Sequence, residues 1–341
     1  MEKERHSKTV IALLSLMHMG VDFLCAFALF GRFIGRYADL FFLYNFCAFA
    51  LQMPLGTLLD ELTARARRKY LPGLLFTLAG ILLTTAGALW SPLILGIGNA
   101  LFHVGGGVLT IREDDLSQLD GQGLGVFVAP GALGLTAGIL LKGNHYSALL
   151  LLVSLLQFFL FFFLFRLRDR LSDQPPGETA DKEGALLMIL LCFLVVALRS
   201  FIGMAVTFSW KKGTALILLS TLSLACGKSA GGFLSHIFGM RKTIIASLLF
   251  AAALYYYGDN PIFGIPALFF FNMTMPLTLY LLAGKMKGSP GLAFGILTFA
   301  LFIGYLPVLY GLVQKLPPFP TGTAGSLLSL VLLLLALRKR S

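Results

Sequence analysis

Charged side chains are scarce in this chain. They make up 13% of its 341 residues, whereas soluble domains carry about 25%. Hydrophobic residues make up 57% of the chain, and the mean hydropathy is +0.84. A fold in water cannot cover this much apolar surface, so the shortage of charge excludes a soluble protein. It indicates an integral membrane protein whose partners include the lipid bilayer.

Cysteines and catalytic motifs are scarce as well. The four cysteines all lie inside apolar runs without C-x-x-C spacing, which disfavours a disulfide framework and a structural zinc site. Gly227-Lys228-Ser229 resembles the end of a phosphate-binding loop, but Leu222 stands where that loop needs its first glycine. No H-E-x-x-H or paired-aspartate pattern suited to intramembrane chemistry occurs. We therefore expect no enzyme, no cofactor and no resident metal.

Acidic residues are outnumbered, and the net charge is +11. Such a balance is compatible with nucleic-acid binding, but the basic residues occur in short clusters between apolar runs. This distribution is typical of the loops of a membrane protein. We therefore expect no nucleic-acid partner.

Most of the chain consists of apolar runs of about 20 residues, which is the length that a helix needs to cross a membrane. We predict twelve spans: 9–30, 39–59, 71–90, 92–111, 123–141, 146–165, 186–207, 213–235, 243–257, 261–284, 290–313 and 321–337. The ninth is short, and proline or glycine interrupts several others. The one long polar stretch predicts an N-terminal six-helix bundle at 1–168, a cytoplasmic linker at 169–184 and a C-terminal six-helix bundle at 185–341.

The distribution of lysine and arginine predicts the orientation. With a cytoplasmic N-terminus, 19 of the 27 basic residues fall in inner segments, 6 in outer segments and 2 inside helices. Cytoplasmic loops carry such an excess. We therefore expect a multi-pass protein of the cell membrane, inner or plasma, with both termini in the cytoplasm.

A loop pattern occurs twice. Gly56-x-x-x-Asp60 runs into a basic cluster that begins at Arg65, and Gly232-x-x-x-His236 runs into one that begins at Arg241. The two glycines are separated by about half the chain. A membrane unit present twice in one chain indicates a transporter.

Both copies resemble loop motifs of the major facilitator superfamily, the first that of loop 2–3 and the second the weaker version of loop 8–9. Ala129-Pro130-Gly131-x-x-Gly134 is similar to the Gly-Pro motif of antiporter-like members. Gly98-Asn-Ala-Leu-Phe102-His103 resembles a helix-4 run of the fosmidomycin-resistance branch, with Val104 in place of its proline. The resemblance implies an all-α integral membrane fold of twelve helices in two pseudo-symmetric six-helix bundles, with helices 1, 4, 7 and 10 lining a central cavity.

The same resemblance assigns a conformational latch to the repeated loops. Gly56 and Gly232 would let neighbouring helices approach closely. Asp60 would contact the opposite bundle, with Arg65, Arg67 and Arg68 supplying countercharge. In the second copy His236 replaces the acid, and Arg241 follows. The alternative is that the basic residues only set the topology.

Polar residues inside the apolar runs are the candidates for substrate binding and proton coupling, because an ionisable group in a membrane is costly. They are His18, Asp22, Gln52, Asn99, His103, Arg199, Lys228 and Asn272. His18 lies one helical turn before Asp22, on the same face. His18, Asp22 and His103 suit proton transfer, and the alternative is that they bind a divalent transition metal.

Two cations leave alternatives open. In the first interpretation, Arg199 binds a carboxylate or phosphate of the substrate through its planar guanidinium. In the second, it forms a permanent ion pair with Asp22. In the third, Asp22 holds it until a proton or the substrate releases it. Lys228 either extends to the inner interface or lines the cavity.

These features together predict a secondary active transporter, monomeric, that moves a small polar or anionic organic solute by alternating access. We expect proton coupling, and the antiporter-like motif at Ala129-Pro130-Gly131 favours efflux. The alternative is a divalent transition-metal transporter. A non-transporting receptor or an intramembrane enzyme ranks below both.

Overall fold

The protein, in a computed structural model, is helical almost throughout, and the structure describes residues 2–33, 38–171, 173–174, 182–313 and 315–338. The α-helices are α1 (Glu2–Ala28), α2 (Ala38–Asn45), α3 (Gln52–Arg65), α4 (Leu71–Trp90), α5 (Pro92–Leu116), α6 (Gln122–Leu141), α7 (Tyr146–Arg166), α8 (Lys182–Ala205), α9 (Gly213–Phe238), α10 (Met240–Tyr256), α11 (Pro261–Asn272), α12 (Thr274–Lys285), α13 (Pro290–Leu309) and α14 (Pro318–Arg338). Two π-helical turns, Leu29–Phe33 and Phe46–Ala50, extend α1 and join α2 to α3.

The predicted spans all correspond to helices. Within the described residues, eleven helical segments are long and apolar enough to cross a membrane. The one predicted span outside these eleven is the ninth, 243–257, which corresponds to α10 and is short at 17 residues. Two spans are each built from a broken helix, α2 with α3 and α11 with α12. The predicted all-α membrane fold is confirmed.

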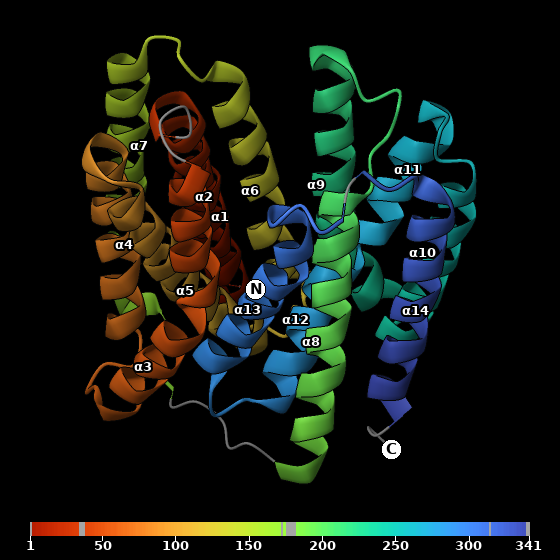
Figure 1. The fold of residues 1–341 in the computed structure, drawn as a ribbon. Helices are drawn as coiled ribbons and strands as arrows, with labels where there is room; N and C mark the ends of the chain where they lie inside the picture. The colour runs from red at the N-terminus through yellow and green to blue at the C-terminus, as the bar shows by residue number, and fades with distance from the viewer. Residues whose placement is uncertain (1, 34–37, 172, 175–181, 314, 339–341) are drawn as a thin grey trace.

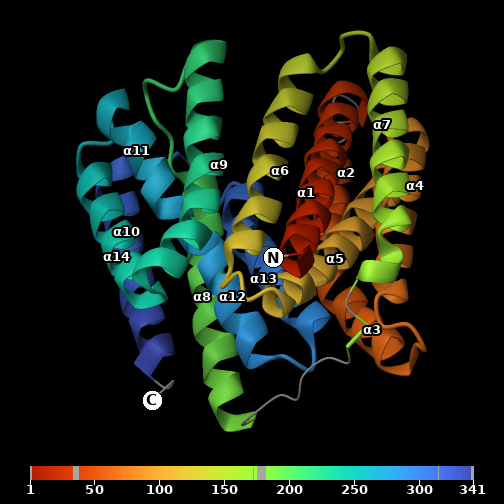
Figure 2. The ribbon, with the colours of Figure 1, turned by 180° about the vertical axis from the view of Figure 1, so that it is seen from behind.

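The helices form two halves, α1–α7 and α8–α14, which stand side by side in Figure 1 and, from behind, in Figure 2. In the first half α1 packs along α6 and α4 along α5, while α6 with α9 and α3 with α13 make the main contacts between the halves. The predicted linker between the bundles lies partly outside the described residues. We call the end of the molecule that holds loops 66–70, 117–121 and 286–289 the linker end, because Asp173 of the linker binds Lys69 there.

Glycines set the closest helix contacts of the first half. A Cβ atom on Gly134 of α6 would lie 2.0 Å from the carbonyl oxygen of Met19 in α1. A Cβ atom on Gly98 of α5 would lie 2.4 Å from the backbone nitrogen of Thr84 in α4. Because no larger residue fits, these contacts hold α1, α4, α5 and α6 backbone to backbone. That packing positions the polar residues that α1 and α5 carry.

Prolines account for the breaks in the two divided spans. Pro54 cannot donate to the carbonyl of Ala50, and the π-helical turn ends at that residue. Pro276 likewise leaves the carbonyl of Asn272 without its helical donor, and α11 ends there. Irregular backbone of this kind is tolerated in a membrane only where protein or a cavity surrounds it.

Candidate functional site

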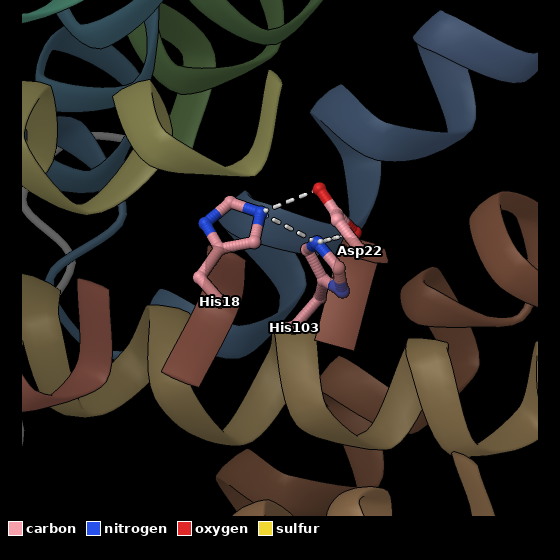
Figure 3. A group of neighbouring side chains, drawn as sticks. All are labelled: His18, Asp22 and His103. Carbon is pink, nitrogen blue, oxygen red and sulfur yellow. Dashed lines mark hydrogen bonds and ion pairs between the residues drawn. The ribbon is translucent and has the colours of Figure 1, made fainter. Parts of the chain in front are cut away.

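A cluster of His18, Asp22 and His103 lies inside the first half, where α1 faces α5 (Figure 3). The Nε2 atom of His18 lies 3.2 Å from Oδ2 of Asp22, and the Nε2 atom of His103 lies 3.5 Å from its Oδ1. The two Nε2 atoms are 2.9 Å apart. The side chains are 8%, 18% and 13% exposed, in that order, so the cluster is mostly buried.

Backbone carbonyls fix the orientation of both imidazoles. Nδ1 of His18 lies 2.7 Å from the carbonyl oxygen of Phe127, and Nδ1 of His103 lies 2.9 Å from that of Asn99. A carbonyl oxygen only accepts, so each Nδ1 carries a hydrogen and donates it. A hydrogen bond between the two Nε2 atoms then requires one further proton. The geometry therefore fits an imidazolium–imidazole pair beside the carboxylate of Asp22.

Asn99 completes the cluster on the side of α5. Its Nδ2 lies 3.4 Å from Oδ1 of Asp22 and 3.4 Å from Sγ of Cys25. Because Asn99 precedes His103 by one helical turn, α5 presents both residues to α1. Asp22 thus lies beside one amide and two imidazole groups.

The sequence of α6 explains how it reaches the cluster. Pro130 has no N–H, so the carbonyl of Val126 lacks its helical donor, and the hydroxyl of Ser15 donates to it over 2.6 Å. Gly131 stands against the cluster, because a Cβ atom there would lie 2.5 Å from both Oδ2 of Asp22 and Nε2 of His18. The Pro-Gly pair therefore leaves room for the imidazole and carboxylate groups.

The remaining predicted residues lie apart from this cluster. Lys228 of α9 donates through Nζ to the carbonyl of Val128, 3.3 Å away on α6. Arg199 of α8 is buried, with 7% of its surface exposed, and its Nη1 finds no hydrogen-bond partner in the part of the chain that the structure describes. No ion pair joins it to Asp22 among those residues, so the arrangement with a permanent pair is not the one present here.

Gln52 and Asn272 serve the broken helices. Nε2 of Gln52 donates to the carbonyl of Ala48 over 2.5 Å, and Nδ2 of Asn272 donates to that of Leu268 over 2.8 Å. Each side chain thus binds its own helix four residues back, next to a break. Neither contacts the cluster.

The first loop motif brings α3 against α13 of the other half at the linker end. A Cβ atom on Gly56 would lie 2.1 Å from the carbonyl oxygen of Gly291. The carboxylate of Asp60 accepts hydrogen bonds from the N–H groups of Gly291 and Leu292, each 2.8 Å long. Ser289, at the N-cap of α13, makes no capping bond with its own side chain. Asp60 therefore caps α13 from the opposite half.

The second motif makes the corresponding contact between α9 and α6. A Cβ atom on Gly232 would lie 2.4 Å from the carbonyl oxygen of Gly121. His236 faces Asp120, with Nδ1 3.0 Å from Oδ2, and the hydroxyl of Tyr280 donates to the same carboxylate over 3.1 Å. The two copies are thus related in position, one through a carboxylate and helix end, the other through an exposed ion pair.

The basic residues of the motifs lie elsewhere. Arg65 pairs with Glu61 one turn away, at 3.8 Å, and its side chain is 82% exposed. The expectation that Arg65 supplies the countercharge of Asp60 is therefore wrong, because backbone N–H groups satisfy that carboxylate. Arg241 is exposed at the start of α10.

Sequence reasoning missed several residues of these contacts. Asp114 accepts from the N–H groups of Gly121 and Gly123, at 2.8 and 2.7 Å, and so caps α6 as Asp60 caps α13. Asp120 was missed as the partner of His236. An aspartate-glycine pair after a helix was the available signal, since it predicts a turn. The sequence marks Gly131 as part of the Ala-Pro-Gly motif but does not indicate that it lies against Asp22 and His18.

Comparisons with known proteins place the fold. No protein-family model matches the chain, and a comparison with curated proteins finds no match. Solved structures match nearly all of it. A variant of the E. coli fucose:proton symporter FucP is 14% identical with a TM-score of 0.66, each chain being 98% covered. The human organic anion transporter MFSD10 is 17% identical with a TM-score of 0.63, over 97% of this chain and 99% of that one.

A third structure, the POT family transporter PepTSo, is 13% identical with a TM-score of 0.59, covering 98% of both chains. All three structures are named as transporters or symporters. At such low identity the likeness shows the fold: the chain has the fold of major facilitator superfamily transporters.

Proposed function

We propose that this protein is a proton-coupled secondary active transporter that moves a small polar or anionic organic solute by alternating access. The observation that supports it most directly is the cluster of His18, Asp22 and His103. These buried groups hold one proton between two imidazoles and next to a carboxylate. Titratable groups are rare inside membranes and mark proton paths where they occur.

The proton controls the shape of the cluster. When it is present, the imidazolium and the carboxylate of Asp22 cancel in charge. When it leaves, two nitrogen lone pairs oppose each other across 2.9 Å beside that carboxylate. Repulsion between them favours a rearrangement of the rings. Loading and release of one proton thus favour two arrangements of the cluster.

Helix α6 connects these arrangements to the second half. The carbonyl of Phe127 holds the ring of His18, and the next carbonyl, of Val128, accepts from Lys228 of α9. A displaced His18 therefore acts on the surface where α6 and α9 meet. Rocking of the halves about this surface would expose a central site to each side in turn.

The contacts at the linker end supply the gate of this cycle. Asp60 with Gly291 and His236 with Asp120 both join the halves there. We propose that they latch the closed linker end and break when it opens. The excess of basic residues at the linker end supports a cell-membrane protein whose linker end faces the cytoplasm. The Ala129-Pro130-Gly131 motif of α6 favours export.

Proteoliposomes that contain the pH dye pyranine test the proposal. External jumps in a panel of monocarboxylates, phosphate monoesters and sugars should move protons for at least one solute. Asp22→Asn should abolish this movement and retain downhill exchange of the labelled solute. Asp39→Asn, at an exposed position of α2, is the matched control. Undiminished proton movement in Asp22→Asn would refute coupling through the cluster.

The same cluster favours a second candidate, a divalent-metal transporter. The three ligand atoms of His18, Asp22 and His103 lie within 4.8 Å of one another. Both imidazoles donate from Nδ1 to carbonyls, as metal-binding histidines do. The two Nε2 atoms are 2.9 Å apart, closer than the roughly 3.3 Å of two nitrogens on tetrahedral zinc. Calorimetry with Zn²⁺ that shows tight binding, lost in His103→Gln, would favour the metal.

A further inference from the structure

A cavity of ≈ 730 Å³ lies within the second half, away from the carboxylate–histidine cluster. Residues of α8, α9, α11 and the segments 206–212 and 315–317 line it. Ligand pockets for small organic molecules have volumes of about 300–1,000 Å³. This cavity is therefore large enough for such a ligand.

Its charges are mostly positive and lie at two depths. Arg199 lines the interior and is buried, whereas Lys211, Lys212 and Lys315 line the mouth and are exposed. Asp259 is the one acid among the lining residues, and it is exposed as well. A cationic mouth raises the local concentration of anions and speeds their entry.

Arg199 is a charged group without an ion-pair partner among the residues that the structure describes. Its Nη1 is buried without a hydrogen bond, and no carboxylate of the described residues lies within ion-pair distance of its guanidinium. A buried, unpaired charge is costly, so a structure keeps one only where something else compensates it. The planar guanidinium binds a carboxylate or phosphate through two parallel hydrogen bonds.

The walls around this charge are largely apolar. Phe208, Leu268 and Phe271 contribute, and Asn272 adds an amide near Arg199. A small inorganic anion would leave these walls without contacts, whereas a hydrocarbon or aromatic body would cover them. We infer that the cavity binds an amphipathic organic anion, with a carboxylate or phosphate head on Arg199 and an apolar body against the aromatic walls.

The inference rests on the proposed function, in which this anion is the transported solute. Proton and anion would then bind in different halves. Lys228 of α9 contacts the first half, where its Nζ donates to the carbonyl of Val128, the residue after the Phe127 whose carbonyl binds His18.

A native fluorophore reports on the cavity. The ring of Trp210 lies 5.0 Å from that of Phe208, and its indole N–H donates to the carbonyl of Gly258 over 2.8 Å. The other tryptophan, Trp90, is 73% exposed at the end of α4 in the first half. The Trp90→Phe protein therefore carries one reporter, beside the cavity.

The experiment titrates this protein in detergent, without a proton gradient, using hexanoate and hexylphosphonate as probes. Hexylamine and hexanol have the same body without the negative head. We expect a saturable change of Trp210 fluorescence with the anions alone. Arg199→Gln should weaken the affinity at least tenfold and Arg199→Lys less, while Lys142→Gln, an exposed cation of the first half, should not change it.

Two outcomes overturn the inference: hexylamine binding as well as hexanoate, or Arg199→Gln binding hexanoate like the parent. If Arg199→Gln does not fold, Leu268→Phe serves, since it narrows the cavity, keeps the charge and adds no second tryptophan; unchanged binding there also overturns the inference. Binding without any proton-coupled flux in proteoliposomes would refute the proposed function and leave the cavity assignment standing. Proton-coupled flux of a solute with unaltered affinity in Arg199→Gln would refute the cavity assignment alone.

Discussion

The carboxylate of Asp60, near the end of α3, accepts a hydrogen bond of 2.8 Å from the backbone N–H of Gly291, the second residue of α13 in the other half. It caps a helix of one bundle with a side chain of the other. The first four N–H groups of a helix have no partner within it, and a carboxylate there is also favoured by the helix dipole. Closure of the linker end and capping of α13 are therefore one event.

Asp60→Ala should open the linker end. Loss of a capping side chain costs about 1 kcal/mol, which shifts a two-state equilibrium about fivefold. Spin labels on Ala64→Cys and Lys287→Cys, in a Cys226→Ser background, report the separation of α3 and α13 by pulsed electron paramagnetic resonance. We expect a larger fraction of long distances. The control is Glu61→Ala, since Glu61 is exposed and pairs with Arg65 on its own helix. Equal distributions in both variants would contradict the latch.

His236→Asp tests the second copy. The new carboxylate would face Asp120, which now lies 3.0 Å from the imidazole, and like charges would push α9 from α6 at the linker end. The two side chains are 44% and 52% exposed, so the effect should be smaller than that of Asp60→Ala. It should vanish in about 1 M salt, where the Debye length is about 3 Å. Distance measurements across this contact at low and high salt check it, and an effect that persists in salt counts against it.

Gly131→Ala should disturb the cluster. Alanine in a helix is normally favoured over glycine by about 1 kcal/mol, but here its Cβ would lie 2.5 Å from Asp22 and His18. Overpacking of this kind costs about 1–3 kcal/mol. We expect a lower unfolding temperature and no proton movement in proteoliposomes. Gly203→Ala is the control for stability, because its Cβ would meet no atom within 4 Å. The account fails here if Gly131→Ala unfolds at the temperature of that control and moves protons as the parent protein does.

Asp173 predicts a pH dependence of linker docking. The backbone N–H of Lys69, with the guanidinium of Arg68, holds the pKa of this carboxyl below its usual value. Its stabilising contribution is thus fully present above the pKa of an unfolded aspartate, about 3.9, and is lost as the pH falls below that. Hydrogen exchange at the Lys69 amide, corrected for intrinsic rates, should show constant protection down to about pH 4 and a decline below. Asp173→Asn should remove the protection throughout; a decline that begins near neutrality would argue against the docking.

The sequence sufficed for the architecture because apolar length and loop charge are local properties. The twelve spans could be counted, and the shared face of His18 and Asp22 followed from helical spacing. The breaks in the two divided spans are harder to predict. Pro54 gives a reason for one of them, but the apolar span continues across that break. The addition of His103 depended on the packing of α5 against α1, which spacing along one helix does not reveal.

Hydrogen bonds from side chains to backbone atoms could not be predicted from the sequence. Asp60 was expected to need arginine, yet it binds the N–H groups of Gly291 and Leu292, which have no side-chain signature. The tautomers of His18 and His103 likewise depend on two carbonyls. The alternatives for Arg199 could not be decided by spacing, because its relation to Asp22 depends on how two halves of the chain meet.

The shared proton of His18 and His103 is the central claim, and nitrogen-15 NMR of protein labelled at its five histidines tests it most directly. Single His18→Gln and His103→Gln variants assign the signals. The account predicts that both Nδ1 atoms stay protonated at every pH and that the two Nε2 atoms gain one proton together, with Asp22→Asn altering both at once. Two rings that titrate independently, or an unprotonated Nδ1 in either, would contradict it.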